Sequence, residues 1–503
     1  MRLTKLLKGL VFLTDEELQL IDDLSISGIV LNSREVAVGD LFIALAGANQ
    51  HGLTYADKVI EKGACAILFD PSGDGNRLAE QPTDILLVPV EHLGSVLGEL
   101  AAKFYGNPSQ GLSVVGITGT NGKTSCSQFL GQLLDDCGVV GTLGWGKWGQ
   151  LNKTINTTPD ALTVQQILAE FVKAKMKTVA MEVSSHGLDQ GRVNGVHFKG
   201  AVFTNISRDH LDYHGTMGNY LSAKLKLLAA PGLEFVVVNL DDASSEQIIE
   251  AVPESVVVWG VSVKGKTIKQ GESIIADAVK HTSSGTEFTV HWRGVVQQVK
   301  TPLFGDFNVE NLLCVLGVML ALGESLADIA KKMQTIKSVT GRLEPCSTSS
   351  NGLNVFIDYA HTPDALYRVL ASLRKHCQQS LWVVFGCGGN RDAGKRPQMG
   401  GIAKQWADRI IVTDDNPRFE NNVEIANEIL AGCRSDKVIL IQDRKQAIQH
   451  AIANAAEDDC IVIAGKGHET YQEINGIQYP FNDKQIAEQA LQVRFVTHED
   501  DAQ

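Results

Sequence analysis

The chain has 503 residues, 44% of them hydrophobic, and a formal net charge of −13 at pH 7. This length and apolar content predict two to four globular domains, each able to bury a core. The acidic balance argues against a general nucleic-acid binder, because phosphate affinity comes mainly from Lys and Arg side chains, but it allows anionic ligands at locally cationic sites.

The N-terminal segment and the cysteines indicate which cellular compartment the protein occupies. Residues 1–17, MRLTKLLKGLVFLTDEE, have a short apolar stretch followed at once by acids, which predicts the first helix of a folded domain rather than a signal peptide. No apolar run approaches membrane-spanning length. The nine cysteines are scattered without a CxxC pair, which favours a reducing compartment. We therefore expect a cytoplasmic protein without a membrane span.

Apolar runs of strand length alternate with amphipathic helical stretches along the chain. This pattern is typical of α/β proteins with mostly parallel sheets. The predicted buried strands are 66–69, 113–117, 178–181, 235–238, 381–385 and 460–464. Two polar, turn-forming segments, 105–111 and 338–342, are the predicted domain boundaries. The resulting domains are 1–108, 109–341 and 342–503.

The strongest single motif is the glycine-rich turn GTNGKT at 119–124, which follows a predicted strand. A helix should start there and end near Gly138. The N–H groups of such a turn bind phosphate, Lys123 can reach the outer phosphates, and the Thr124 hydroxyl can hold Mg²⁺ directly or through water. Ile117 replaces the first glycine of the general GxxxxGK[ST] motif. A phosphate loop alone is compatible with kinases, GTPases, transporters and ligases.

Further polar residues that could complete a phosphate site follow two other strands. Glu182 ends one of them, where a carboxylate is well placed to bind Mg²⁺ beside phosphates. The segment 203–215 contains two aspartates and two histidines close together, and His210 is a candidate ligand of a second metal ion. In a predicted helix after it, one of Lys224 and Lys226 is expected to point into the site and the other into solvent.

Together these motifs resemble the Mur ligase family, the ATP-dependent amino-acid-adding enzymes of peptidoglycan synthesis. GTNGKT, EVSSHGL, TNISRDHLDYHG, GDFNVENLL, TGR, DYAHTPD and AGKGHE occur in the family's order and span most of the chain. The resemblance implies an N-terminal UDP-sugar domain, a central phosphate-loop ATPase domain and a C-terminal Rossmann-like domain. It also implies ATP-driven addition of an amino acid to UDP-N-acetylmuramoyl-L-alanyl-D-glutamate through an acyl phosphate.

The resemblance assigns roles to individual residues. Catalytic roles are implied for Lys123, Lys224 and His210. ATP binding is implied for Gly119, Thr120, Asn121, Gly122, Lys123, Thr124, Ser125, Asn308, Asn311, Arg342 and Asp358. Binding of two Mg²⁺ ions is implied for Thr124, Glu182, His210 and Lys224. Lys224 matches the lysine that CO₂ converts to a carbamate in this family, which turns a cation into an anion able to help hold Mg²⁺.

The two other substrates have their own implied residues. The UDP-muramoyl peptide is expected at Leu31, Ser33, Ala48, Asn49, Gln50, Asn156, Thr157, Thr158, Ser184, Gln190 and Arg192. Asn32 stands where the family often has an aspartate. The incoming amino acid is expected at Arg391, Asp415, Asn416, Pro417, Arg418, Gly465 and Glu469.

The turn Asp415-Asn416-Pro417-Arg418 resembles the signature of family members that select meso-diaminopimelate. An arginine can pair bidentately with the distal carboxylate of this amino acid, which lysine lacks. We attribute rejection of L-lysine to leaving Arg418 unpaired, at a cost of about 1–3 kcal/mol. The three turns that carry the amino-acid-binding residues follow parallel strands and should meet at one edge of a sheet.

Three alternatives remain open at this point. The chain resembles in part a folylpolyglutamate synthetase, although the N-terminal segments LNSR and GANQHG argue against it. A Mur ligase that adds L-lysine at the same step is the second. A non-catalytic nucleotide-binding regulator is the third, and the presence of Lys123, Glu182, His210 and Lys224 argues against it. We expect a monomer with no nucleic-acid partner.

Overall fold

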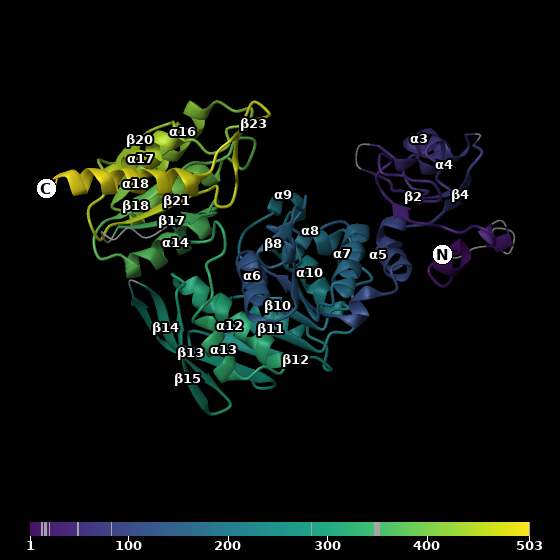
Figure 1. Cartoon of the computed structure of the whole chain (residues 1–503), viewed down its shortest axis with the longest axis horizontal. Helices are drawn as coiled ribbons and strands as arrows, with labels where there is room; N and C mark the ends of the chain where they lie inside the picture. Colours follow the sequence, from purple (N-terminus) through teal and green to yellow (C-terminus); the bar gives the residue numbers. More distant parts are fainter. Residues whose placement is uncertain are drawn as a thin grey trace. The chain divides into compact units, whose positions relative to one another are not determined.

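The computed structural model describes residues 1–11, 14, 18–19, 21–47, 50–81, 83–282, 284–346 and 353–501. The chain divides into two compact units, Met1–Val238 with Asp242–Trp259, and Asn239–Asp241 with Gly260–Gln503. Each unit combines sheets with covering helices (Figure 1).

The N-terminal part of the first unit is a four-stranded parallel sheet in the order β1-β2-β3-β4. Alternate residues of β3 enter different cores: Ala66 and Leu68 pack on one face, Ile67 and Phe69 on the other. Both faces are therefore covered, as parallel sheets require. The elements are α1 (Leu3–Leu7), β1 (Ile29–Val30), β2 (Leu41–Ala44), α3 (Ala56–Glu61), β3 (Ala66–Phe69), α4 (Gly75–Ala79), β4 (Leu86–Pro89) and α5 (Leu93–Phe104).

The central part of the first unit is built on a larger sheet. Its strands run β11-β10-β5-β9-β6 in parallel and continue antiparallel through β7 and β8. The strands are β5 (Ser113–Thr118), β6 (Cys137–Gly141), β7 (Gly144–Lys147), β8 (Gln150–Asn152), β9 (Thr178–Glu182), β10 (Gly200–Phe203) and β11 (Phe235–Asn239). The helices are α6 (Lys123–Leu133), α7 (Ala161–Lys173), α8 (Ser185–Asp189), α9 (Leu211–His214), α10 (Met217–Leu225) and α11 (Ser245–Glu250).

The predicted end of the helix after the phosphate loop is wrong. The helix α6 already ends at Leu133, and Gly138 lies inside β6. Asp136 adopts a left-handed φ of 52°, which turns the chain between the two elements. Gly138 serves close packing instead, because a Cβ there would lie 2.8 Å from the Phe171 ring.

The second unit begins with an antiparallel meander of β13, β14 and β15, followed by two helices. Its six-stranded sheet has the order β16-β17-β21-β18-β19-β20, parallel except for β16. The strands are β13 (Glu272–Thr282), β14 (Gly285–Trp292), β15 (Val295–Thr301), β16 (Glu344–Pro345), β17 (Asn354–Asp358), β18 (Leu381–Phe385), β19 (Arg409–Val412), β20 (Val438–Leu440), β21 (Cys460–Ala464), β22 (Tyr471–Ile474) and β23 (Ile477–Pro480). The helices are α12 (Asp306–Ala321), α13 (Leu326–Met333), α14 (Pro363–His376), α15 (Lys395–Trp406), α16 (Asn422–Cys433), α17 (Arg444–Asn454) and α18 (Asp483–Asp501).

The predicted α/β fold with mostly parallel sheets is confirmed. The six predicted strands are β3, β5, β9, β11, β18 and β21, each within one residue of its expected ends. The antiparallel meander was not foreseen. All nine cysteines are free thiols, and in the described parts of the chain no helix is long and apolar enough to cross a membrane.

Candidate active site

The phosphate loop lies between β5 and α6 and depends on two glycines with positive φ. Gly119 has φ 144° and Gly122 has φ 88°, conformations that other residues rarely adopt. A Cβ on Gly119 would lie 1.9 Å from Thr204 Oγ1, so the loop passes too close to β10's end for any side chain. Thr120 N donates to Asn205 O at 2.7 Å and ties the loop to that neighbour. These contacts hold the loop against the residues that follow β10.

Two lysines converge on this loop. Lys123 Nζ donates to Gly119 O at 2.8 Å, and Lys224 Nζ donates to the same oxygen at 2.9 Å. Lys224 comes from α10, whose N-terminus is capped by the Thr216 hydroxyl. Its ammonium lies 4.6 Å from the centroid of the Tyr220 ring, and the residue is only 1% exposed. Burial, reinforced by Lys123, lowers the pKa of Lys224 well below its usual range.

Glu182, the last residue of β9, is fully buried and held by neutral donors. It accepts hydrogen bonds from Thr124 Oγ1 at 2.9 Å, from Ser127 Oγ at 3.3 Å, and from Thr142 N and Oγ1 at 3.0 Å each. Gly141 leaves the room for this carboxylate, because a Cβ there would lie 2.0 Å from Glu182 Oε1. Sequence reasoning placed Thr124 and Glu182 in one site, and the structure brings them into direct contact.

His210 belongs to a cluster of aromatic rings beside the loop. Its ring centroid lies 4.8 Å from that of His186, which in turn lies 4.3 Å from Tyr213. Partial burial lowers the pKa of His210, the nearby Lys123 and Lys224 add to this, and Asp209 opposes it. The neutral imidazole, the form that binds metal ions, is therefore favoured.

Four of the residues expected to bind the muramoyl peptide form one hydrogen-bonded group next to Glu182. Thr158 Oγ1 donates to Glu182 O at 3.0 Å and Ser184 N donates to Thr158 Oγ1 at 2.9 Å. Arg192 donates to Thr158 O at 2.9 Å and, through Nη2, to Gln190 Oε1 at 2.6 Å. The Ser184 hydroxyl also caps α8.

The remaining residues of that set are spread over the first unit. The hydroxyls of Thr157 and Thr142 lie 3.0 Å apart, which links Thr157 to the Glu182 network, whereas Asn156 is exposed. Leu31 and Ser33 follow β1 and are half-buried. Gln50 follows β2 and accepts a hydrogen bond from Tyr55 at 3.1 Å. Ala48 and Asn49 lie outside the described residues.

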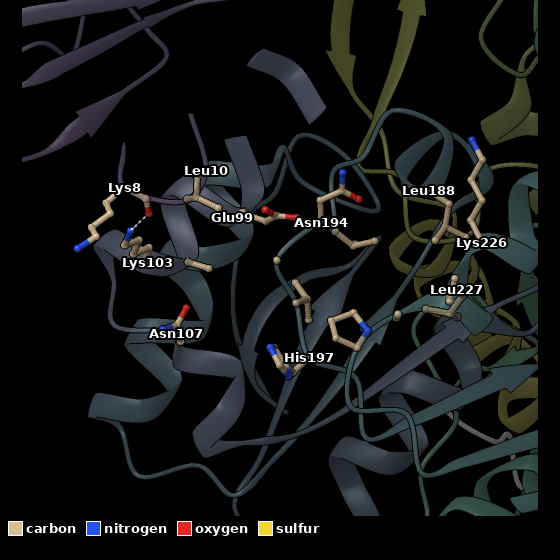
Figure 2. A pocket seen from close by; sticks show the side chains of 17 residues that line it. Lys8, Leu10, Glu99, Lys103, Asn107, Leu188, Asn194, His197, Lys226 and Leu227 are labelled. Carbon is tan, nitrogen blue, oxygen red and sulfur yellow. Dashed lines mark hydrogen bonds between the residues drawn. The ribbon is translucent and has the colours of Figure 1, made fainter. Parts of the chain in front are cut away.

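A cavity of about 630 Å³ in the first unit lies apart from these residues. Lys8 and Lys103 line one side of it, and Lys226 lines the other (Figure 2). Lys226 Nζ is paired with Asp189 at 2.6 Å. None of the predicted site residues lines this cavity. The two lysines of the α10 region therefore differ as expected, since Lys224 lies under the phosphate loop and Lys226 does not.

In the second unit, Asn308 and Asn311 are buried on the first turns of α12. Asn308 Nδ2 donates to Phe304 O at 2.8 Å, and Asn311 Nδ2 donates to Asn308 Oδ1 at 3.4 Å. These bonds fix the orientation of both amides. Asparagine amides held in this way can offer a donor and an acceptor to a planar polar ligand.

Arg342 and Asp358 lie together in the second unit. The Arg342 guanidinium stacks 4.6 Å from the Tyr359 ring centroid. Asp358 accepts hydrogen bonds from Leu343 N and Ala360 N at 2.7 Å each. Burial raises the pKa of Asp358 to about 6, with Arg342 opposing the shift.

The loops after β18, β19 and β21 meet at one edge of the six-stranded sheet, because these strands are direct neighbours. Asn416 Nδ2 and Lys466 Nζ both donate to Glu469 Oε2, at 2.8 and 3.0 Å. A Cβ on Gly465 would lie 2.6 Å from Asp415 Oδ2. The structure therefore brings Asp415, Asn416, Gly465 and Glu469 together as expected, and Arg391 is an exposed residue of the first of these loops.

Arg418 is not unpaired, so the reason given above for rejecting lysine is wrong. Its Nε donates to Glu473 Oε2 at 3.2 Å, and its Nη1 donates to Gly389 O at 2.9 Å. The side chains of Arg418 and Glu473 are only 19% and 22% exposed. A lysine substrate would leave Arg418 with these two partners.

Three family models match the chain. The model of the Mur ligase family catalytic domain matches residues 25–105, that of the middle domain 117–319, and that of the glutamate ligase domain 341–467. UDP-N-acetylmuramoyl-L-alanyl-D-glutamate--2,6-diaminopimelate ligase of Pseudomonas aeruginosa is 45% identical over 487 residues, 95% of this chain and 97% of that protein. The chain belongs to the Mur ligase family.

Other proteins similar to this Mur ligase agree. The ligase of the same name from Coxiella burnetii is 44% identical over 474 residues, 93% of this chain and 96% of that protein. A solved structure of a ligase of this name is 33% identical with a TM-score of 0.69 and covers 94% of this chain and 96% of that one. Folylpolyglutamate synthase of Mycobacterium tuberculosis shares the fold alone, at 19% identity and a TM-score of 0.59 over 73% of this chain and 91% of that one.

Sequence reasoning missed a buried ion pair that supports the loops after β19 and β21 of this Mur ligase. Arg444 and Asp483 are fully buried, and Arg444 Nη2 donates to Asp483 Oδ2 at 2.8 Å. The same guanidinium donates to Asp414 O at 3.2 Å and to Ala464 O at 2.9 Å, at the ends of β19 and β21. Arg444 is the first residue of the amphipathic helix α17, where an arginine is ordinarily exposed. The sequence therefore carries no signal of its burial.

Proposed function

We propose that this Mur ligase uses ATP to add meso-diaminopimelate to UDP-N-acetylmuramoyl-L-alanyl-D-glutamate in peptidoglycan synthesis. The observation that carries the proposal is the 45% identity, over nearly the full length, with a curated ligase of that name. In the reaction, the D-glutamyl carboxylate attacks the γ-phosphate of ATP, the bond between that phosphate and ADP breaks, and an acyl phosphate and ADP form. The incoming amine then attacks the acyl carbon, and the tetrahedral intermediate collapses with loss of phosphate.

The phosphate loop supports the first step. This step brings two anions together, so cations and aligned N–H groups must offset their repulsion. Lys123 Nζ donates to the loop carbonyls Gly119 O and Thr120 O, which holds its ammonium at the phosphate loop. The residues assigned to the phosphate cradle are Gly119, Thr120, Asn121, Gly122, Lys123, Thr124 and Ser125.

The Thr124 hydroxyl and the Glu182 carboxylate would hold Mg²⁺, because the ion prefers oxygen ligands and these two lie in contact. When bound, Mg²⁺ neutralises charge on the phosphates. His210 is the proposed ligand of a second ion. Within the described residues no three His, Cys, Asp or Glu side chains gather as a metal cluster. Phosphate oxygens and a modified Lys224 would have to complete the coordination.

Gly141→Ala should test the placement of Glu182. A Cβ at residue 141 would lie 2.0 Å from Glu182 Oε1, so the new methyl group would overlap the carboxylate and displace it. Displacing a charged group of the site by about 1 Å is expected to lower kcat about 100-fold. The measurement is ATP-dependent product formation at saturating substrates. Gly111→Ala is the control, because a Cβ there meets nothing within 4 Å; equal rates for both variants would rule out a positional role of Glu182.

Lys224 is the proposed site of carbamylation by CO₂. The nucleophile in this reaction is a neutral amine, and burial favours that form of Lys224 by lowering its pKa. The amine forms a bond to the carbon of CO₂ and releases one proton, so that an anionic carbamate replaces the neutral amine. The product carries oxygen ligands for Mg²⁺ at a position where an unmodified lysine would repel the ion.

The remaining groups of buried and hydrogen-bonded residues are assigned to ATP and to the muramoyl peptide. We propose that Asn308 and Asn311 face the adenine, and that Arg342 and Asp358 contact ATP from the C-terminal domain. The group of Thr158, Ser184, Gln190 and Arg192, joined to Glu182 O, offers donors for the muramoyl peptide; the proposed set is completed by Leu31, Ser33, Ala48, Asn49, Gln50, Asn156 and Thr157.

For the amino acid, Arg418 is proposed to pair with the distal carboxylate and Arg391 with the other one. Asp415 and Glu469 are proposed to accept the ammonium groups, and Glu469 Oε2 is already bonded to Lys466. Asn416 and Pro417 shape the turn, and Gly465 leaves space for Asp415. Diaminopimelate is favoured because its second carboxylate adds a charge-assisted hydrogen bond to Arg418 that lysine cannot form.

We also propose the domain ranges 1–108, 109–341 and 342–503, and a cytoplasmic monomer. The free thiols fit a reducing compartment. The monomer is testable by light scattering of the purified full chain.

The proposed function is tested by phosphate release from ATP with the purified full-length chain. We expect release only when UDP-N-acetylmuramoyl-L-alanyl-D-glutamate and an amino acid are both present, and a lower KM for meso-diaminopimelate than for L-lysine. Preference for lysine would identify the lysine-adding ligase instead. Activity with a folate and glutamate would identify a folylpolyglutamate synthetase, and release without either substrate an unrelated ATPase.

A further inference from the structure

Glu473, on β22, holds residue 418 through backbone and side chain. Arg418 N donates to Glu473 O at 3.0 Å, and Asn475 N donates to Arg418 O at 2.7 Å. Arg418 has a left-handed φ of 53°, a conformation that is unfavourable for a non-glycine residue. These backbone bonds stabilise that conformation. Glu473 N also donates to Asn416 Oδ1 at 2.9 Å, so β22 is hydrogen-bonded to the turn at two residues, Asn416 and Arg418.

The side-chain contacts fix the plane of the guanidinium. Glu473 Oε2 accepts from Nε at 3.2 Å and Gly389 O accepts from Nη1 at 2.9 Å, so two of the three nitrogens are held. In the described part of the chain no hydrogen bond is made by Nη2, which leaves that nitrogen to face a ligand. A free arginine side chain has several rotatable bonds, and holding it in one orientation removes an entropic cost of binding.

We propose that Glu473 is a positioning residue that presents Arg418 to the distal carboxylate of diaminopimelate and so sets the preference over lysine. This inference rests on the proposed function. Glu473 is not the residue that meets the substrate. It acts through Arg418, and for that reason its removal should affect only substrates that carry the second carboxylate.

Glu473→Ala and Glu473→Gln together test this role in the full-length chain. We expect Glu473→Ala to raise the KM for meso-diaminopimelate about tenfold, without changing kcat at saturation or the KM values for ATP and L-lysine. Glu473→Gln keeps an oxygen that can accept from Arg418 Nε, and its KM for diaminopimelate should stay within about threefold of the wild-type value. Gln478→Ala is the matched control, because Gln478 pairs with Glu473 across the same hairpin and is exposed.

The outcomes separate the two proposals. A wild-type chain that does not use diaminopimelate overturns the proposed function, whatever the variants do. A wild-type chain that uses it while Glu473→Ala keeps the same KM overturns only the role of Glu473. A lower KM in Glu473→Ala would mean that Glu473 competes with the substrate for Arg418, and would also overturn the inference. If the alanine variant is insoluble, Glu473→Asp, which withdraws the carboxylate by one methylene, carries the same expectation.

Discussion

Replacing Lys224 by alanine is expected to reduce ligase activity at least about 1,000-fold, and small carboxylates such as acetate or propionate should restore part of it. The expectation follows from the burial of Lys224 beside Gly119 O and Lys123, where a carbamate would place an anion next to the phosphates. Losing an anion that holds a metal ion removes transition-state stabilisation of several kcal/mol. The measurement is kcat as a function of added carboxylate.

The neighbouring lysine provides the control for this prediction. Lys226→Ala removes a lysine of the same region that is paired with Asp189 and lines the separate cavity, so it should keep the wild-type rate and show no response to acetate. Full activity of Lys224→Ala, or loss of activity without any rescue, would count against the carbamate. Mass spectrometry at neutral pH, with and without added bicarbonate, gives an independent readout of the 44 Da adduct expected for CO₂.

Arg418→Ala should remove the preference for meso-diaminopimelate. We expect the KM for this amino acid to rise about 30-fold or more, because a hydrogen-bonded charge pair in a half-buried site is lost, while the KM for L-lysine stays unchanged. The preference is the ratio of kcat/KM for the two amino acids, measured with each as the varied substrate.

Arg409→Ala is a suitable control for Arg418→Ala. Arg409 lies at the opposite end of β19 and is exposed, so its removal changes the charge of the domain by the same amount without touching the amino-acid loops. If Arg418→Ala kept its preference for diaminopimelate over lysine, the assignment of Arg418 to the distal carboxylate would be wrong. A lysine KM that rose in parallel would point to general damage of the loop.

The features that the sequence predicted best, the strands and the glycine-rich turn, depend on local residue patterns. The apolar runs predicted the strands β18 and β21, and the expectation that the loops meet at one edge followed because parallel neighbours end on the same side. The glycine-rich turn was recognisable because Gly119 and Gly122 adopt conformations that few other residues tolerate.

Other features depend on contacts between residues far apart in the chain, and the sequence could not predict them. Glu473 meets Arg418 across 55 residues, and nothing in the alternating pattern of β22 distinguishes Glu473 from an ordinary exposed strand residue. Gly138 was misread because glycine is common at helix ends and also occurs in strands where another group approaches closely. Only the position of Phe171 decides between the two.

The burial of Lys224 also has a consequence for how long a modification would last. A carbamate decomposes to amine and CO₂ once its nitrogen takes up a proton, and the surroundings that lower the pKa of the lysine oppose the arrival of that proton. The Tyr220 ring and the phosphate loop enclose the nitrogen. The same enclosure that favours formation would therefore slow decay, and a modified enzyme should keep its carbamate for many turnovers after CO₂ is withdrawn.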